Sequence, residues 1–226
     1  MTPDTMAIPD EQKPDYKVLI KKALEVKAAK AQELHNLGLR PPVMWPRSIL
    51  TRVAEIVPMA DITALAAALT APPPSTALLS DSAQILSDTL KQLAFTANHL
   101  NAGGMAAPQL GVGLRVFVVR VTREDGSVDT VGIINPTLAD VRGEQESNEG
   151  CLSIPGERFT VQRPGFVRVT GWGGDGEPIE IGGDGILACV LQHELDHLNG
   201  NLLVDSVSHL KRSLIRRRLV KAYPLH

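Results

Sequence analysis

The segment 185–200, GILACVLQHELDHLNG, constrains the fold more than any other part of the chain. Its apolar residues and its final glycine predict a buried helix that ends at Gly200. His193 and His197 are four residues apart, so on a helix their imidazoles face the same point. Glu194 projects about 100° away from His193, where it can act as general base on metal-bound water. The pattern predicts a metal hydrolase, with a chance match as the alternative.

Two histidines cannot hold a catalytic metal alone, so a third ligand is required. Leu203 stands where the HExxHxxGxxH pattern would place a histidine, and no glutamate follows Glu194. Cys189 lies on the same helical face, but 189–197 rises about 12 Å, and ligand bonds measure only about 2.0–2.3 Å. Asp205 and His209 lie downstream, but their spacing matches no known metal-site geometry, and we expect a helix N-terminal acid and a surface histidine there. That leaves Cys151, which lies upstream in a turn-to-strand setting. A buried structural thiol is the alternative for this cysteine.

Composition places the chain among ordinary globular proteins. It has 226 residues, of which 43% are hydrophobic and 21% charged, and a net charge of −2. This charge gives no basis for general binding to DNA or to anionic membranes. The sequence contains no apolar run of about 18 residues and no signal-peptide pattern at its start. We therefore expect a cytoplasmic protein with no membrane partner.

The remaining patterns predict an α+β fold. Antiparallel β-sheets should pack around the central HExxH helix, with helices before and after them. The expected hairpins turn at Asp125-Gly126 and Asp175-Gly176, and the expected strands are 114–122, 128–136, 165–173 and 177–183. Further helices are expected at 16–37, 82–101 and 206–223. The apolar positions of the helix 82–101 are Ile85, Leu86, Leu90, Leu93 and Ala94.

The domain organisation predicted from these patterns has two parts. Residues 1–46 form an N-terminal extension, with a disordered start at 1–15 followed by a helix. Residues 47–226 form the catalytic domain. An Ala/Pro-rich insertion around 59–80 should comprise a short helix and a loop on the surface of this domain.

Three motifs in order carry a resemblance to a known family. EGCLS (149–153), QHELDH (192–197) and AGGMAAPQ (102–109) resemble the three signatures of peptide deformylases. The third family signature is GxGxAAxQ, and Ala102 departs from its first glycine. The resemblance covers about residues 47–222. It implies an enzyme that removes the formyl group from N-formylmethionyl peptides.

The resemblance also implies roles for individual residues. Cys151, His193 and His197 would hold one divalent metal. Family members typically use iron(II), and the soft thiolate also suits zinc, nickel or cobalt. Glu194 would take the proton of the attacking water. The side-chain amide of Gln109 and the backbone N–H of Leu152 would stabilise the oxyanion.

Other residues are candidates for binding the peptide. Gly103 and Gly104 would expose backbone groups to which an extended peptide can add as a strand. An apolar pocket for the methionine side chain could be lined by Ile186, Cys189 and Val190, with core packing as the alternative.

Two roles are open for each of three charged residues. The resemblance suggests that Glu149 supports the site and that Arg158 contacts substrate or orders its loop, and surface salt bridging is the alternative for both. Asp196 is either a partner of the metal ligands or a helix-surface acid.

The last predicted helix is basic and carries no acidic residue. Its cations are Lys211, Arg212, Arg216, Arg217, Arg218 and Lys221. They form either a solvated face or a surface that docks on the ribosome, where the substrate emerges. Two other functions compete with deformylation: an HExxH metalloprotease, and a catalytically altered deformylase-like protein. The missing downstream ligand argues against the protease, and the intact motifs argue against the altered relative.

Overall fold

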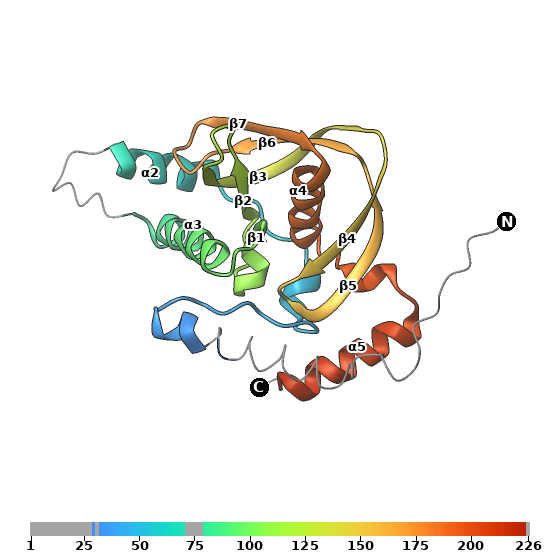
Figure 1. Cartoon of the computed structure of the whole chain (residues 1–226). Coiled ribbons are helices and arrows are strands. Elements are labelled where there is room, and N and C mark those ends of the chain that lie inside the picture. Colours follow the sequence, from blue (N-terminus) through green and yellow to red (C-terminus); the bar gives the residue numbers. More distant parts are fainter. Residues whose placement is uncertain (1–28, 30–31, 71–78, 225–226) are drawn as a thin grey trace.

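The structure, a computed structural model, describes residues 29, 32–70 and 79–224 (Figure 1). Among these residues, no helix is long and apolar enough to cross a membrane. The predicted disordered start, 1–15, and most of the predicted helix 16–37 lie outside the described residues. The end of that helix is described, and its chain turns at Gly38 with a φ of 71°.

Two antiparallel sheets and the helices around them confirm the predicted α+β class. The larger sheet has the strand order β1-β2-β3-β6-β7. Its strands are β1 (Gly104–Ala106), β2 (Val116–Thr122), β3 (Val128–Arg142), β6 (Phe166–Trp172) and β7 (Pro178–Asp184). The second sheet is the hairpin of β4 (Gln145–Cys151) and β5 (Ile154–Arg163). The two predicted hairpins are present, with positive φ at Gly126 and Gly176.

The helices flank these sheets, and α4 lies between the larger sheet and the β4–β5 hairpin (Figure 1). They are α2 (Met59–Thr70), α3 (Asp81–His99), α4 (Gly185–Leu198) and α5 (His209–Ala222). Short 3₁₀ turns are η2 (Ser48–Thr51), η3 (Ala107–Leu110) and η4 (Leu203–Ser206).

Helix α4 is the predicted HExxH helix, and one of its faces packs on the larger sheet. The buried positions on this face are Ala188, Leu191, Leu195 and Leu198, which join Phe117, Val119, Val167 and Val169 in one cluster. The helix therefore turns another face, with His193 and His197, toward the hairpin. Gly200 follows with a φ of 76°, and a Cβ there would lie 2.8 Å from the carbonyl oxygen of Thr51. Only glycine fits this ending without strain.

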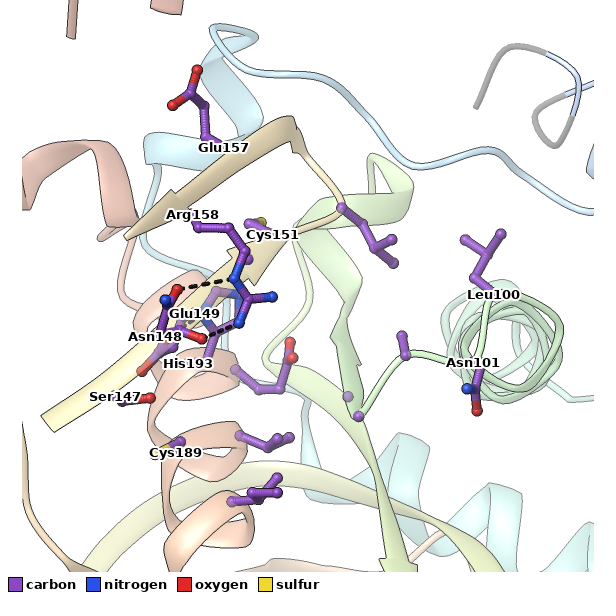
Figure 2. Close-up of a pocket in the computed structure, with 18 of the residues that line it drawn as sticks. Leu100, Asn101, Ser147, Asn148, Glu149, Cys151, Glu157, Arg158, Cys189 and His193 are labelled. Atoms are coloured by element: carbon purple, nitrogen blue, oxygen red, sulfur yellow. Dashed lines mark hydrogen bonds and ion pairs between the residues drawn. The ribbon is translucent and has the colours of Figure 1, made fainter. Parts of the chain in front are cut away.

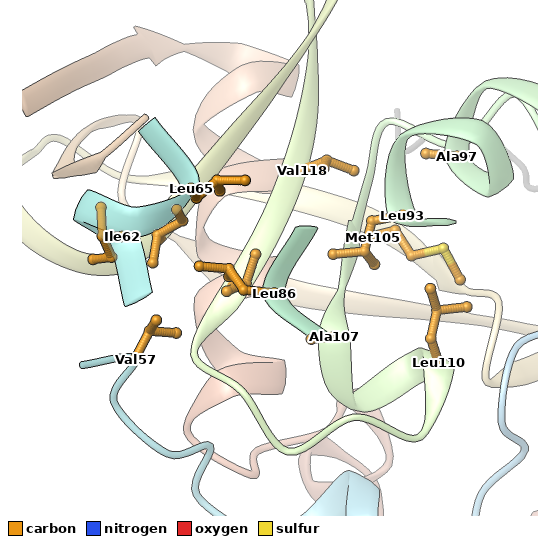
Figure 3. Packing of buried hydrophobic residues seen from close by; sticks show 12 residues of the cluster. Val57, Ile62, Leu65, Leu86, Leu93, Ala97, Met105, Ala107, Leu110 and Val118 are labelled. Atoms are coloured by element: carbon orange, nitrogen blue, oxygen red, sulfur yellow. The ribbon is translucent and has the colours of Figure 1, made fainter. Parts of the chain in front are cut away.

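Helix α3 confirms the predicted helix 82–101, and Leu86, Leu90 and Leu93 of its five predicted apolar positions pack in the core. Ser80 caps it by accepting a hydrogen bond from the backbone N–H of Ala83. Leu86 and Leu93 are fully buried in the cluster of Figure 3. Ile85 was expected to face the core but is 52% exposed. Adjacent helical residues point about 100° apart, so Leu86 and Ile85 cannot both face the sheet.

Helix α2 occupies the first part of the predicted insertion around 59–80, and two of its residues are buried in the core. Ile62 and Leu65 are 1% and 4% exposed and belong to the same cluster as Leu86 (Figure 3). Asp61 accepts hydrogen bonds from Ser80 and Ser82 at the start of α3. One apolar face of α2 therefore packs in the core beside α3, and its other face is exposed. Residues 71–78, the expected loop, lie outside the described residues.

A third buried cluster lies beside the β4–β5 hairpin. It joins Cys151, Ile154 and Phe159 of the hairpin to Trp45 and to Ile215 and Leu219 of α5. The hairpin was not predicted. Cys151 lies at the end of β4, before a turn, rather than in the expected turn-to-strand setting.

Candidate metal centre

The three predicted metal ligands converge between β4 and α4. Cys151, His193 and His197 each offer one ligand atom, and these atoms all lie within 4.8 Å of one another. The sulfur of Cys151 is 3.3 Å from Nε2 of His197. Within the described part of the chain, this is the one His/Cys/Asp/Glu group that could hold a metal ion. The fold thus brings the upstream cysteine to the HExxH helix, as the elimination required.

The chemistry of this donor set fits a borderline divalent ion. Burial raises the pKa of Cys151, but the charges and hydrogen bonds of His197 and His193 outweigh it and hold the pKa well below its ordinary value. The thiolate, which is the form that binds metals, is therefore favoured. Two imidazoles and one thiolate form the three-ligand set of catalytic sites that keep a further coordination position open.

A buried ion-pair network orients His193. Nδ1 of His193 lies 3.1 Å from Glu149, so its other ring nitrogen is left for the metal. Arg163 donates to both oxygens of Glu149, at 2.9 and 3.0 Å, and to Asp196 at 2.6 Å. Burial raises the pKa of Glu149, but the hydrogen bonds from His193 and Arg163 outweigh it and lower the pKa to about 2. Glu149 thus contacts the ligand His193 directly, whereas Asp196 contacts Arg163.

Arg163 belongs to this network but was not among the predicted site residues. Its side chain is only 11% exposed. In the sequence it stands four residues after Phe159 and two after Val161. An alternating pattern of this kind places all three residues on one face of a strand. That pattern could have revealed an inward-facing arginine, had the segment been recognised as a strand.

Glu194 lies beside the ligands and is 3% exposed. Burial raises its pKa to about 7, against the opposing charges of His193 and His197. Its Oε2 has no hydrogen-bond partner among the described residues. A buried, unpaired carboxylate oxygen is available to a water or to a substrate proton.

Glycine 104 allows β1 to approach this carboxylate closely. A Cβ at Gly104 would lie 2.8 Å from Cγ and Oε1 of Glu194 and 2.8 Å from Cγ1 of Val190. At Gly103 it would lie 2.9 Å from Cγ2 of Val190. The structure places both predicted glycines against α4, where an added methyl group would displace Val190 or Glu194.

Gln109 points its amide toward the metal ligands. Its Oε1 accepts a hydrogen bond from the backbone N–H of Ala106 at 2.9 Å. Its Nε2 therefore faces Cys151, at 3.7 Å from Sγ, and the hydroxyl of Ser153 at 3.5 Å. Gln109 is 2% exposed. Leu152 follows Cys151, and both residues line the groove beside the metal ligands.

A groove of about 990 Å³ leads to these residues and runs between β1 and β4. Figure 2 shows the α4 side chains below it and Leu100 and Asn101 across from β4. Of the predicted pocket residues, Cys189 and Val190 line it half-buried, whereas Ile186 is 84% exposed at its rim. Ile186 does not pack in the core.

Arg158 lies over the β4 edge of the groove. It donates to Oδ1 of Asn148 at 2.9 Å and also to the backbone carbonyl of Asn148 (Figure 2). The hydrogen-bond partners of Arg158 are therefore an amide and a backbone carbonyl of β4, and Arg158 also lines the groove.

Comparisons with known proteins agree with this geometry. The model of the polypeptide deformylase family matches residues 75–213. A peptide deformylase of Thermodesulfovibrio yellowstonii is 42% identical over 135 residues, which cover 60% of this chain and 80% of the relative. Peptide deformylase 1 of Pseudomonas syringae pv. tomato is 40% identical over 151 residues, covering 66% and 87%.

Solved structures of relatives share the fold. A crystal structure of a peptide deformylase from Legionella pneumophila has 35% identity and a TM-score of 0.63, covering 81% of this chain and 94% of that one. The peptide deformylase of Ehrlichia chaffeensis, solved in complex with actinonin, has 27% identity and a TM-score of 0.65, covering 83% and 99%. The family model matches more than half of the chain, and the Cys-His-His centre lies within the matched residues. The chain therefore belongs to the peptide deformylase family.

Proposed function

We propose that the groove binds N-formylmethionyl peptides and that the residues around Cys151 carry out their deformylation. The observation that carries this proposal is the convergence of Cys151, His193 and His197 beside the buried Glu194. A divalent ion held by these three residues would supply a Lewis acid that makes hydroxide available near neutral pH.

The protein's own groups would then move the proton and stabilise the charge. Glu194 takes a proton from the attacking water and passes it to the leaving amine, a double task that suits a pKa of about 7. The amide of Gln109 and the backbone N–H of Leu152 donate to the negative oxygen of the tetrahedral intermediate. Glu149, held by Arg163, keeps His193 in its ligating orientation.

The peptide would lie along the groove as an added strand. Gly103 and Gly104 leave the β1 edge open to its backbone. The methionine side chain would enter beside Cys189 and Val190, with Ile186 at the rim. This arrangement contacts the peptide backbone and one apolar side chain, so peptides of many sequences can bind. Because the Ehrlichia chaffeensis relative was solved with actinonin, we expect the same compound to bind in this groove.

We propose iron(II) as the metal in the cell, with zinc, nickel or cobalt as functional substitutes. The thiolate ligand favours such soft or borderline ions over magnesium or calcium. Metal analysis of protein purified without oxygen, beside cobalt- and zinc-loaded samples, tests this assignment. Zinc as the dominant ion in such preparations would contradict it.

Formate release separates deformylation from the competing protease function. The protein should release formate from formyl-Met-Ala peptides and leave internal peptide bonds intact. Cleavage of internal bonds without release of formate would support an HExxH metalloprotease instead. Failure of both reactions in metal-loaded protein would support the catalytically altered relative.

We also propose that residues 47–226 form the catalytic domain and that residues 1–46 form an extension. Within the catalytic domain, we propose that α5 docks on the ribosome. Three cations of α5 have partners within the protein: Arg212 pairs with Asp205, Arg218 with Glu157, and Lys211 lies over Phe159. The outward face instead carries Leu210, Leu214, Arg216, Arg217 and Lys221, all exposed. A mixed cationic and apolar face of this kind suits an RNA–protein surface.

Charge reversal tests this docking surface without removing the buried side of α5. Arg216, Arg217 and Lys221 would be changed to Glu together, and exposed Lys91 of α3 would be changed to Glu as the control. The triple variant should lose salt-dependent co-sedimentation with ribosomes while it still releases formate. Unchanged co-sedimentation of the triple variant would refute the proposal.

A further inference from the structure

The segment 43–45 runs beside both loops that carry the proposed oxyanion donors. The backbone N–H of Val43 donates to the carbonyl oxygen of Gln109 at 2.7 Å. The backbone N–H of Trp45 donates to the carbonyl oxygen of Ser153 at 2.9 Å. One short segment therefore forms a main-chain hydrogen bond with each of the two loops.

Each hydrogen bond is made to a residue that carries a proposed oxyanion donor or that directly follows one in the chain. Val43 holds the backbone of Gln109, whose side-chain amide faces the metal ligands. Trp45 holds the residue that follows Leu152, whose N–H is the second donor. The direct contacts of the Gln109 amide with the other loop are longer, at 3.5 Å to Ser153 and 3.7 Å to Cys151. The segment thus gives each loop a short main-chain hydrogen bond to a shared element.

The segment is itself well fixed. Trp45 is 4% exposed and packs in the cluster that contains Cys151. The guanidinium of Arg212 lies 5.7 Å from the centre of its ring. Nearer the N-terminus, the N–H of Arg40 donates to Gln92 of α3, which in turn donates to the carbonyl of Gly38. The segment is therefore held at both ends while it bonds the two loops.

We propose that Val43 and Trp45 are positioning residues for the oxyanion site. Their main-chain N–H groups hold the Gln109 amide and the Leu152 N–H at the separation that the developing negative oxygen requires, because displacement of such donors weakens transition-state stabilisation. This inference rests on the oxyanion roles in the proposed function. It also assigns residues 43–45 to the catalytic unit, although they lie within the N-terminal extension 1–46.

A double-mutant cycle tests the proposal. Val43→Pro removes the N–H group, and Val43→Ala keeps it and serves as the control. We expect Val43→Pro to lower kcat about 10-fold below that of Val43→Ala, with KM within about twofold. In a Gln109→Ala background, Val43→Pro should cost less than about twofold, because the donor that it positions is gone. Metal content should be unchanged in all variants.

Two outcomes would overturn the proposal. One is an equal loss of kcat from Val43→Pro in the wild-type and Gln109→Ala backgrounds. The other is a kcat of Val43→Pro that equals the kcat of Val43→Ala. If Val43→Pro does not fold, replacing Val43 by its α-hydroxy acid removes the same N–H in a chain of almost unchanged shape, and the same outcomes apply. Full activity of Gln109→Ala alone would instead refute the oxyanion role in the proposed function, so the two failures are distinguishable.

Discussion

Replacing Arg163 by leucine should damage both the stability of the protein and its hold on the metal. Arg163 makes three charge-assisted hydrogen bonds, two to Glu149 and one to Asp196. The side chains of Arg163 and Glu149 are only 11% and 8% exposed. Removing one partner of a buried ion pair costs about 3–5 kcal/mol, because the other charge is left uncompensated.

The expected shift in melting temperature follows from this cost. For a protein of this size, 1 kcal/mol corresponds to about 2–4 °C, so Tm should fall by about 6–20 °C. Glu149 would also hold His193 less firmly, and loss of such outer contacts typically weakens metal binding about 10–100-fold. Thermal unfolding and metal retention against a chelator measure the two effects separately.

A second substitution shows whether the unpaired charge is the cause. Glu149→Gln in the Arg163→Leu background removes the buried negative charge, and its amide oxygen can still accept from His193. We expect the double variant to recover part of the lost stability. The reasoning is refuted if Arg163→Leu melts within about 2 °C of wild type and keeps its metal, or if Glu149→Gln lowers Tm further in that background.

Three further predictions concern the glycines and the metal. Gly104→Ala should lower kcat about 100-fold with metal content unchanged, because Glu194 must shift by up to about 1 Å to clear the new methyl group; equal kcat would contradict this. Gly200→Ala should destabilise the fold by more than about 1 kcal/mol in urea unfolding, since its φ is 76° and Thr51 lies close, whereas an unchanged midpoint would show that the helix ending relaxes. Aerobic storage should inactivate the iron form through oxidation of the iron and of Cys151, but spare the zinc form, and equal inactivation of both forms would argue against the iron assignment.

The metal ligands could be predicted from the sequence because coordination geometry restricts them strongly. Helical spacing pairs His193 with His197, and bond lengths exclude Cys189. Only a residue from another element could complete the site, and Cys151 was the remaining candidate. The α+β class followed in the same way, from periodic apolar patterns and from turn residues with positive φ.

Arg163 could not be assigned to the site because its element was not recognised. The β4–β5 hairpin carries many polar residues on its strands, so its alternation is weak as a sequence signal. Ile85 and α2 show a related limit. Helical spacing allows more than one apolar face, and tertiary packing selected the face of Leu86 and buried Ile62. The hydrogen bonds of Val43 and Trp45 are main-chain contacts, which no side-chain pattern reports.

The most direct test of the account compares Glu194→Ala with Cys151→Ala. Each purified protein would be prepared without oxygen, and its metal content and formate release from formyl-Met-Ala would be measured together. We predict that Glu194→Ala keeps about one metal per chain and loses turnover by at least about 100-fold, whereas Cys151→Ala loses the metal itself. Full metal content in Cys151→Ala, or near-normal turnover in Glu194→Ala, would contradict the assignment of the thiolate as ligand and the glutamate as base.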